Sequence, residues 1–303
     1  MAGEVLELGT GDRVPSICFG GGARIRDGRV FEDALETGFR FFDTAVTYRN
    51  DHLLLSSEAG RRLAADQRES LVVCSKISLG HPLPETVREA LGRMGLEYLD
   101  LLLLHHPVHP QDDDPLERLQ GTWRTMEQLV DEGLVRMIGL SNTGPSLLRF
   151  LLDSCRIGPV VDQVEFHPYA QDRRLLAACE EAGIRVQAYC PLGSPWRQAA
   201  RGKEPPTVDP VVTEIARAKG KAPSQVILRW LVDKRVIPVV SAIRAEHMQQ
   251  NLDVFDFDLT SSEREAIDAL DRRDRIWSDP AKLAGLFGTV DNGVLTVPDE
   301  WPR

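Results

Sequence analysis

Eight short apolar runs recur along this 303-residue chain and limit the folds that it can adopt. They are rich in Val, Ile, Leu and Phe, and their apolar residues are largely continuous instead of alternating with polar ones. Such runs are typical of parallel strands that are buried on both faces. We therefore expect eight parallel strands, in residues 14–20, 39–45, 71–77, 99–106, 135–142, 160–167, 184–190 and 235–242.

Amphipathic segments with helical spacing lie between these runs, for example in residues 83–95 and 114–133. Several of them end in a glycine, such as Gly38, Gly95 and Gly183, as helices often do. Eight strand–helix alternations over about 250 residues match a TIM barrel. The sequence therefore predicts an α/β fold, a (β/α)8 TIM barrel in a single domain over residues 1–303.

A doubly wound sheet is the alternative fold for alternating strands and helices. That fold places a GxGxxG turn after its first strand, and the glycines of residues 20–28, GGGARIRDG, do not have this spacing. The barrel is therefore preferred. Residues 193–210 and 277–303 are expected to form a loop and a tail with little regular structure.

The charge balance excludes several classes of partner. Asp and Glu number 46 against 36 Lys and Arg, which gives a net charge of −10. Binding to nucleic acids or to anionic membranes needs a basic face, so neither is expected. The N-terminus resembles no signal peptide, and the five cysteines show no CxxC spacing. We expect a reduced, cytoplasmic protein; the oligomeric state is left open.

Polar residues stand at the carboxyl end of strand after strand. In a (β/α)8 barrel these ends meet at one mouth, where catalytic groups are carried. Each residue alone has a structural explanation as a cap, a solvated strand end or a packing residue, but the coincidence across strands favours an active site. The residues are Asp43, Lys76, His105 or His106, Ser141, Asn142, Gln163 to His167, Tyr189 and Ser241.

Four of the residues in this region form a plausible proton-donating group for the reduction of a C=O bond. Tyr48 is a weak acid with a reference pKa near ~10. A lysine ammonium such as Lys76 stabilises phenolate and lowers the pKa of the tyrosine, and Asp43 fixes the lysine. His105 on the next strand can orient the carbonyl oxygen.

The same residues carry a family resemblance over residues 5–270. The motifs GFRFFDTAVTYRND, SKIS, LDLLLLHHP, IGLSN, DQVEFHPY, AYCPLGS and LRWL occur in an order that resembles the aldo-keto reductase superfamily. The resemblance implies Tyr48 as the general acid, Lys76 and Asp43 as its tuning pair, and His105 as the group that orients the substrate. His105 is chosen over His106 by its distance from the following proline, and because adjacent strand residues face opposite sides.

The resemblance also implies the contacts of a nicotinamide cofactor. Ser141, Asn142 and Gln163 would bind the carboxamide group, and Tyr189 would stack on the ring. Leu192 and Ser194 would lie along the pyrophosphate. Near the adenosine, the resemblance implies a further set of residues: Ser241, Arg244, His247, Gln250 and Asn251.

Two departures from the family's pattern affect these expectations. Gly21 and Gly22 replace a common Thr-Trp pair and are expected to widen the pocket. Ser241 and His247 stand where many relatives have a lysine and an arginine for the 2′-phosphate, which leaves Arg244 as the permanent cation nearby. We therefore expect NADPH to be preferred by a reduced margin, with usable NADH activity.

The substrate is expected to be a small carbonyl compound. In the family, residues 106–115, 193–210 and the C-terminal segment, here 274–303, would shape the pocket. Its candidate lining residues are Trp196, Trp277, Phe287 and Trp301. The three histidines of residues 105–115 lack a second group of ligands, so no metal site is expected.

Two other functions remain as alternatives. One is a nucleotide-binding regulatory protein of the same superfamily with little catalytic activity, although the chain shows no extension that would serve a partner. The other is an aldolase-type barrel in which Lys76 forms a Schiff base. The expected cofactor residues and Tyr48 disfavour the second.

Overall fold

A closed barrel of eight parallel strands forms the centre of the computed structural model, which describes residues 4–79, 83–107, 114–276, 290–291 and 294–295. The order around the barrel is β10-β3-β4-β5-β6-β7-β8-β9. This confirms the predicted (β/α)8 barrel, because each expected run contains one barrel strand. The strands are β3 (Cys18–Gly20), β4 (Phe41–Asp43), β5 (Val72–Ile77), β6 (Leu99–Leu104), β7 (Val135–Ser141), β8 (Val161–Glu165), β9 (Arg185–Tyr189) and β10 (Ile237–Val240).

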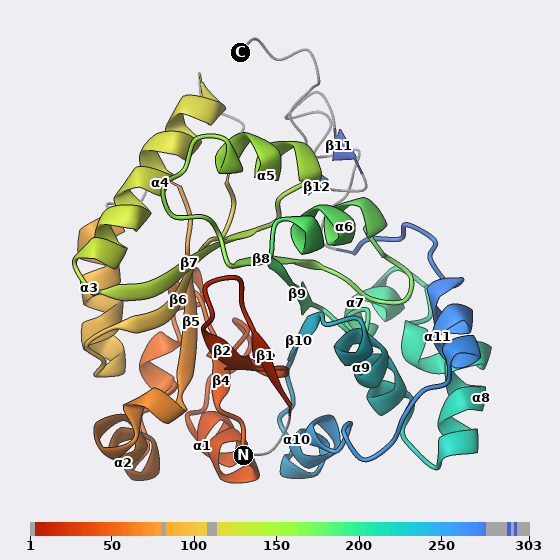
Figure 1. Ribbon diagram of the computed structural model, residues 1–303. Coiled ribbons are helices and arrows are strands. Elements are labelled where there is room, and N and C mark those ends of the chain that lie inside the picture. Colours follow the sequence, from red (N-terminus) through yellow and green to blue (C-terminus); the bar gives the residue numbers. More distant parts are fainter. Residues whose placement is uncertain (1–3, 80–82, 108–113, 277–289, 292–293, 296–303) are drawn as a thin grey trace.

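Helices surround the strands as a ring (Figure 1). Local sequence sets their ends: Asp114 accepts hydrogen bonds from the first backbone N–H groups of α4, and Thr260 with Glu263 forms a capping box on α11. The helices are α1 (Arg29–Thr37), α2 (Glu58–Asp66), α3 (Leu83–Met94), α4 (Pro115–Asp131), α5 (Pro145–Leu152), α6 (Arg173–Glu181), α7 (Pro195–Ala200), α8 (Pro210–Lys219), α9 (Pro223–Asp233), α10 (Ala245–Leu252) and α11 (Ser261–Asp268). Two-residue strands β11 (Val290–Asp291) and β12 (Val294–Leu295) pair near the C-terminus.

An N-terminal hairpin precedes the barrel and was not predicted. Its strands are β1 (Val5–Glu7) and β2 (Arg13–Pro15), so the run at residues 14–20 serves two strands with a break between them. Leu6 and Val14 of the hairpin belong to the apolar cluster of the barrel interior. In Figure 1 the hairpin lies in front of the barrel strands, and it directly precedes the amino end of β3.

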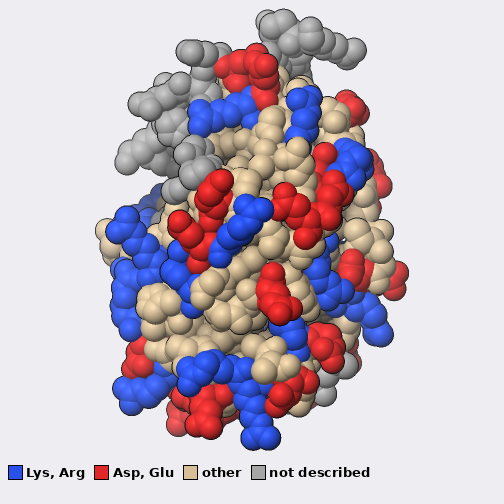
Figure 2. All heavy atoms as spheres, turned by 90° about the vertical axis from the view of Figure 1, so that its left-hand side faces the viewer, with Lys and Arg blue, Asp and Glu red and all other residues tan. Residues whose placement is uncertain are grey.

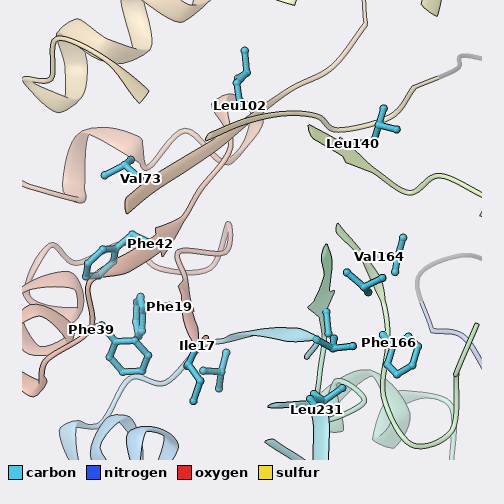
Figure 3. Packing of buried hydrophobic residues seen from close by; sticks show 14 of the residues in the cluster. Ile17, Phe19, Phe39, Phe42, Val73, Leu102, Leu140, Val164, Phe166 and Leu231 are labelled. Atoms are coloured by element: carbon cyan, nitrogen blue, oxygen red, sulfur yellow. The ribbon is translucent and has the colours of Figure 1, made fainter. Parts of the chain in front are cut away.

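Alternate residues of each strand face the barrel interior or the helices. Inward residues such as Phe41 and Leu101 form one apolar cluster, and their outward neighbours form another with the helices. Figure 3 shows part of the outer cluster, where the ring centroids of Phe19 and Phe39 lie 5.3 Å apart. The inward series continues two residues beyond Phe41 to Asp43, so the interior becomes polar at the carboxyl ends of the strands.

The segment at residues 193–210 is more regular than expected. It contains α7 and a 3-10 helix, η4 (Pro206–Val208). Prolines occupy the first turns of both elements, where their fixed φ favours a helix and their missing N–H is tolerated. The prediction of a largely irregular loop is therefore wrong for this segment, whereas 277–289 lies outside the described residues.

The surface carries charges of both signs. Figure 2, which faces the side of α3 and α4, shows Lys and Arg interspersed with Asp and Glu. The net charge of −10 is therefore not concentrated on this face.

Within the described part of the chain, no helix is both long and apolar enough to cross a membrane.

The glycines after β3 differ in the space around them. A Cβ on Gly21 would lie 2.9 Å from ring carbons of Phe31 and 3.0 Å from the carbonyl oxygen of Asp43. A Cβ on Gly22 would meet nothing within 4 Å. The expectation that both glycines widen the pocket is therefore wrong for Gly21. A glycine is needed there because the Phe31 ring and the Asp43 backbone leave no room for a Cβ.

We expect Gly21→Ala to destabilise the protein by about 1–3 kcal/mol, because the added methyl group overpacks the contact with Phe31. Gly22→Ala is the matched control and should stay within about 0.5 kcal/mol of the unchanged protein. Urea denaturation measures both. Equal stabilities of the two variants would contradict this account of Gly21.

Candidate active site

A buried ion pair lies at the mouth of the barrel. Lys76 Nζ of β5 is 2.5 Å from Asp43 Oδ1 of β4 and donates to the Thr44 carbonyl at 2.9 Å. The Lys76 side chain is fully buried. Burial by itself lowers the pKa of Lys76, but the Asp43 carboxylate more than compensates and the pKa lies above its usual value. The ammonium is therefore charged at neutral pH.

An amide network extends from this pair across the barrel. Gln163 Nε2 of β8 donates to Asp43 Oδ1 and to Gln187 Oε1 of β9, both at 2.8 Å. Gln187 was not predicted as a site residue, although it lies two residues before Tyr189 and so faces the same side of its strand. The network gives Asp43 Oδ1 a second donor besides Lys76 and so helps to fix the carboxylate.

Tyr48 lies above the ion pair on a 3-10 turn, η1 (Val46–Tyr48). Lys76 Nζ is 5.3 Å from the centroid of its ring. The buried Asn50 holds the neighbouring loop, because its Nδ2 donates to the carbonyls of Gly21 at 2.9 Å and Ile25 at 3.1 Å. The turn is thus tied to the end of β3.

The pKa of Tyr48 is shifted by opposing influences. Lys76 is the largest of them and lowers the pKa, as the sequence predicts, while burial and the Asp43 carboxylate raise it. The net pKa is above the ordinary value of 10.0, so the expected net lowering is wrong. The reason is that burial of the phenol and, after it, the Asp43 carboxylate together outweigh the charge of Lys76. Tyr48 is a protonated phenol at neutral pH.

His105 completes the group from the end of β6. Its ring meets the Tyr48 ring edge-to-face, with centroids 5.9 Å apart. Burial, then the charge of Lys76, lower the pKa of His105 to about 2, so its imidazole is neutral. Its Nδ1 is buried and, among the described residues, has no hydrogen-bond partner. When its hydrogen is on a ring nitrogen, a neutral imidazole beside a phenol can donate a hydrogen bond to an oxygen bound between the two rings.

The two adjacent histidines do not face opposite sides. Their rings stack, with centroids 4.5 Å apart and planes 11° from parallel. Both residues follow the last residue of β6, Leu104, so the alternation of a strand no longer applies to them. The prediction that a single histidine reaches this side is wrong, although His105 is the one next to Tyr48.

A known protein family matches this chain over most of the barrel. The sequence profile of the Aldo/keto reductase family matches residues 27–272. The chain belongs to the aldo/keto reductase family. It is therefore an oxidoreductase of this family, which confirms the resemblance carried by its motifs.

Individual relatives of this aldo/keto reductase match it over nearly their whole length. An aldo/keto reductase of Synechocystis sp. is 34% identical, with 98% of this chain and 96% of that protein covered. Aldo-keto reductase family 1 member A1 of Cricetulus griseus is 36% identical, with 90% of each chain covered. The crystal structure of a Bombyx mori aldo-keto reductase in complex with NADP has a TM-score of 0.83 and 29% identity, covering 93% of this chain and 97% of that one.

The residues expected to bind a nicotinamide lie together in this aldo/keto reductase. Asn142 has a left-handed backbone, with φ 59°, and its Nδ2 donates to the His105 carbonyl at 2.9 Å. Tyr189 donates its hydroxyl to Asn142 Oδ1 at 2.8 Å, and Ser141 Oγ donates to the Gln163 carbonyl at 2.8 Å. These contacts connect the candidate cofactor residues to one another and to the His105 backbone.

The loop after β9 carries the next expected residues. Leu192 is partly buried against the core, and Ser194 precedes α7 with a left-handed backbone, φ 43°. Ser194 Oγ donates to Cys190 Sγ at 2.9 Å. On the neighbouring strand, Ser241 after β10 donates its hydroxyl to the Gly20 carbonyl. Their pyrophosphate and adenosine contacts stay predictions.

The residues expected near the adenosine gather at α10. The Arg244 guanidinium and the His247 ring contact each other, and both residues are exposed. Among the described residues, no carboxylate forms an ion pair with Arg244. Gln250 is exposed, whereas Asn251 is buried. The structure therefore shows an uncompensated cation at the position where a phosphate is expected.

The expected substrate-pocket residues are described in part. Trp196 is 45% exposed, and the guanidinium carbon of Arg24 lies 3.7 Å from its ring centroid. Trp277, Phe287 and Trp301 lie outside the described residues. So does part of the histidine-rich segment at 105–115; within the described chain, no cluster of His, Cys, Asp or Glu could hold a metal.

A second buried pair at the mouth lies within the strand-end residues 163–167, but the sequence assigned no role to either member. Glu165 Oε1 and His167 Nε2 are 3.1 Å apart, and both side chains are fully buried. Glu165 is two residues beyond Gln163 on β8, so the strand alternation predicts that both face the interior. That spacing is the signal in the sequence that could have identified Glu165.

The neutral state of His105 makes stability depend on pH. Its pKa is about 2 in the folded protein and about 6.5 when unfolded, so the unfolded chain binds more protons between these values. Stability is therefore present above about pH 6.5 and is lost as the pH falls. We expect His105→Asn to lose less stability than the unchanged protein between about pH 7 and about pH 5.

Urea denaturation at the two pH values measures this difference. His52→Asn, which replaces an exposed histidine, is the control and should keep the pH dependence of the unchanged protein. An identical pH dependence for His105→Asn would show that His105 is not held neutral.

Proposed function

We propose that this aldo/keto reductase reduces the C=O bond of an aldehyde or ketone to an alcohol with an NAD(P)H cofactor. The observation that carries the proposal is the buried Asp43–Lys76 ion pair beneath Tyr48 and His105. The Lys76 ammonium has three oxygen acceptors and is not exposed, so it is not a solvated surface charge. It is instead placed to stabilise negative charge that develops on the phenol.

The residues around this group suit a dinucleotide cofactor. Arg244 offers positive charge without a partner carboxylate among the described residues, which suits a phosphate. Asn142 and Tyr189 lie beside His105, where a nicotinamide would meet a carbonyl substrate. When bound, the reduced nicotinamide supplies the hydride. That the relative from Bombyx mori was crystallised in complex with NADP supports this assignment.

The protein's own residues handle the proton. Tyr48 is protonated at neutral pH and donates its phenolic proton to the substrate oxygen, which becomes the alcohol. Lys76 then stabilises the phenolate, and Asp43 keeps the ammonium in place. His105, neutral through burial and the charge of Lys76, orients the carbonyl oxygen through a ring nitrogen without competing as an acid.

The structure disfavours the Schiff-base alternative. A lysine must lose its proton to attack a carbonyl carbon, yet the pKa of Lys76 is raised by Asp43 despite burial. Lys76 is also fully buried beneath Tyr48, so a substrate would meet the phenol first. No observation in the described residues favours the regulatory alternative.

We expect Tyr48→Phe to lower kcat for carbonyl reduction by about 10²–10⁴-fold, because the proton donor is removed. The dissociation constant for NADPH, measured by fluorescence titration, should stay within about threefold, since the substitution removes a transition-state interaction. Tyr98→Phe is the control: Tyr98 lies against Arg68 and outside the site. Retention of more than a tenth of kcat by Tyr48→Phe would exclude Tyr48 as the acid.

The proposed cofactor is NADPH, with NADH also used. A 2′-phosphate carries close to two negative charges, and its burial without a cation is unfavourable. We expect Arg244→Ala to lower kcat/KM for NADPH by about 10-fold or more, as loss of a charge-assisted contact would. The value for NADH should change by less than about twofold. Steady-state kinetics with both cofactors measures the ratio.

Arg88→Ala is the control for this substitution, because Arg88 on α3 pairs with Glu132 on the surface. It should leave the NADPH-to-NADH ratio unchanged. Equal kcat/KM values for the two cofactors, before and after Arg244→Ala, would show that Arg244 does not contact the phosphate.

A further inference from the structure

The residue that follows Tyr48 has a strained backbone. Arg49 adopts the left-handed conformation, with φ 55°, which is uncommon for a residue other than glycine and persists only where neighbouring contacts hold it. Among the described residues, none forms a hydrogen bond with the Tyr48 side chain, and the Tyr48 carbonyl accepts from the exposed Arg26 at 3.3 Å. The position of the phenol therefore depends on how the backbone beyond it is held.

An ion pair holds this backbone three residues after Tyr48. Asp51 begins a second 3-10 turn, η2 (Asp51–Leu53), and its side chain is 1% exposed. Arg93, in the last turn of α3, donates from Nε to both carboxylate oxygens at 3.1 Å and from Nη2 to Oδ2 at 2.6 Å. The His52 N–H donates to Oδ1 at 3.0 Å. Paired contacts of this kind fix direction as well as distance.

Two adjacent side chains tie the segment to different parts of the barrel. Asn50 binds the loop after β3, and its Oδ1 accepts from Thr44 after β4 at 3.3 Å. Asp51 instead binds α3, the helix that follows the strand of Lys76. The strained residue therefore stands between Tyr48 and a pair of anchors that reach opposite neighbours of β4.

Loss of Arg93 would leave a buried carboxylate without its cation, which is strongly unfavourable. Among the described residues, Asp51 would keep a single side-chain partner, the His52 N–H. The carboxylate regains donors only by reaching water, and η2 must open for that. Arg49 then loses one of the anchors that keep it left-handed, and a change in its φ turns the backbone next to Tyr48.

We propose that Asp51 and Arg93 are positioning residues for the general acid Tyr48. This inference rests on the proposed function, in which Tyr48 donates the proton to the substrate oxygen. Neither residue donates that proton; Arg93 holds Asp51, and Asp51 holds the backbone that carries the phenol.

Hydrogen exchange tests the anchor without any measurement of activity. The Leu53 N–H donates to the Asn50 carbonyl at 3.0 Å, and the Leu54 N–H donates to the Asp51 carbonyl at 3.1 Å. Exchange of these groups reports the opening of η2. We expect it to be about 10-fold faster or more in Arg93→Ala, because local opening becomes easier. Mass spectrometry of peptides that cover η2 measures the rate.

Two substitutions on the same helix are the controls. Glu89 is the second carboxylate near Arg93, at 4.0 Å, and its side chain is 73% exposed. Arg88 pairs with Glu132 on the surface. Glu89→Ala and Arg88→Ala should each leave exchange in η2 within about twofold, because exposed pairs contribute little. An exchange rate in Arg93→Ala equal to that of the controls would overturn the anchor.

Arg93→Lys covers the case in which Arg93→Ala does not fold. It keeps a cation beside Asp51 but loses the paired donors, so we expect exchange in η2 to be about threefold faster. An unchanged rate in Arg93→Lys contradicts the anchor when Arg93→Ala cannot be measured.

Single-turnover kinetics then tests the effect on Tyr48. We expect Arg93→Ala to slow carbonyl reduction by about 10-fold, with the dissociation constant for NADPH within about twofold, because the acid is misplaced and the cofactor residues are not touched. In the Asp51→Asn background, Arg93→Ala should change the rate by less than about twofold, since a neutral amide needs no cation.

The outcomes separate this inference from the proposed function. Faster exchange in η2 with an unchanged single-turnover rate would contradict the positioning of Tyr48 and leave the proposed reaction intact. An equal loss of rate in the Asp51→Asn background would contradict an effect through Asp51. Full activity of Tyr48→Phe would instead contradict the proposed function.

Discussion

The buried ion pair between Lys76 and Asp43 is the interaction on which the rest of the site depends. Desolvation of an ammonium and a carboxylate is costly, and their attraction compensates for it when further hydrogen bonds complete the geometry. The Thr44 carbonyl and Gln163 supply those bonds. Because the pair is fixed, the positive charge beneath Tyr48 has a fixed position. A charge that is already in place can stabilise negative charge on the phenol without any rearrangement.

The barrel supplies the environment that this pair needs. The N-terminal hairpin and inward residues such as Phe41 and Leu101 fill the lower interior with apolar groups. The same inward alternation then places Asp43, Lys76 and Gln163 at the opposite end. A single set of strand positions therefore places an apolar base beneath the buried charges.

Much of this arrangement follows from sequence, because buried parallel strands have long apolar runs and polar residues that end them are conspicuous. The rest depends on contacts between distant segments. The stacking of His105 on His106 follows from where β6 ends, and element boundaries are poorly encoded locally. The tight space at Gly21 depends on Phe31. The net pKa of Tyr48 depends on opposing charges whose distances the sequence does not give.

The central claim is that the Lys76–Asp43 pair, taken together, favours the ionised phenol of Tyr48. Ultraviolet titration of Tyr48, by difference against Tyr48→Phe in each background, measures this directly. The double substitution Asp43→Asn with Lys76→Met removes both charges without leaving one unpaired. Because Lys76 influences the pKa of Tyr48 more than Asp43 does, we expect that pKa to rise in the double variant. An unchanged or lower pKa would contradict the account.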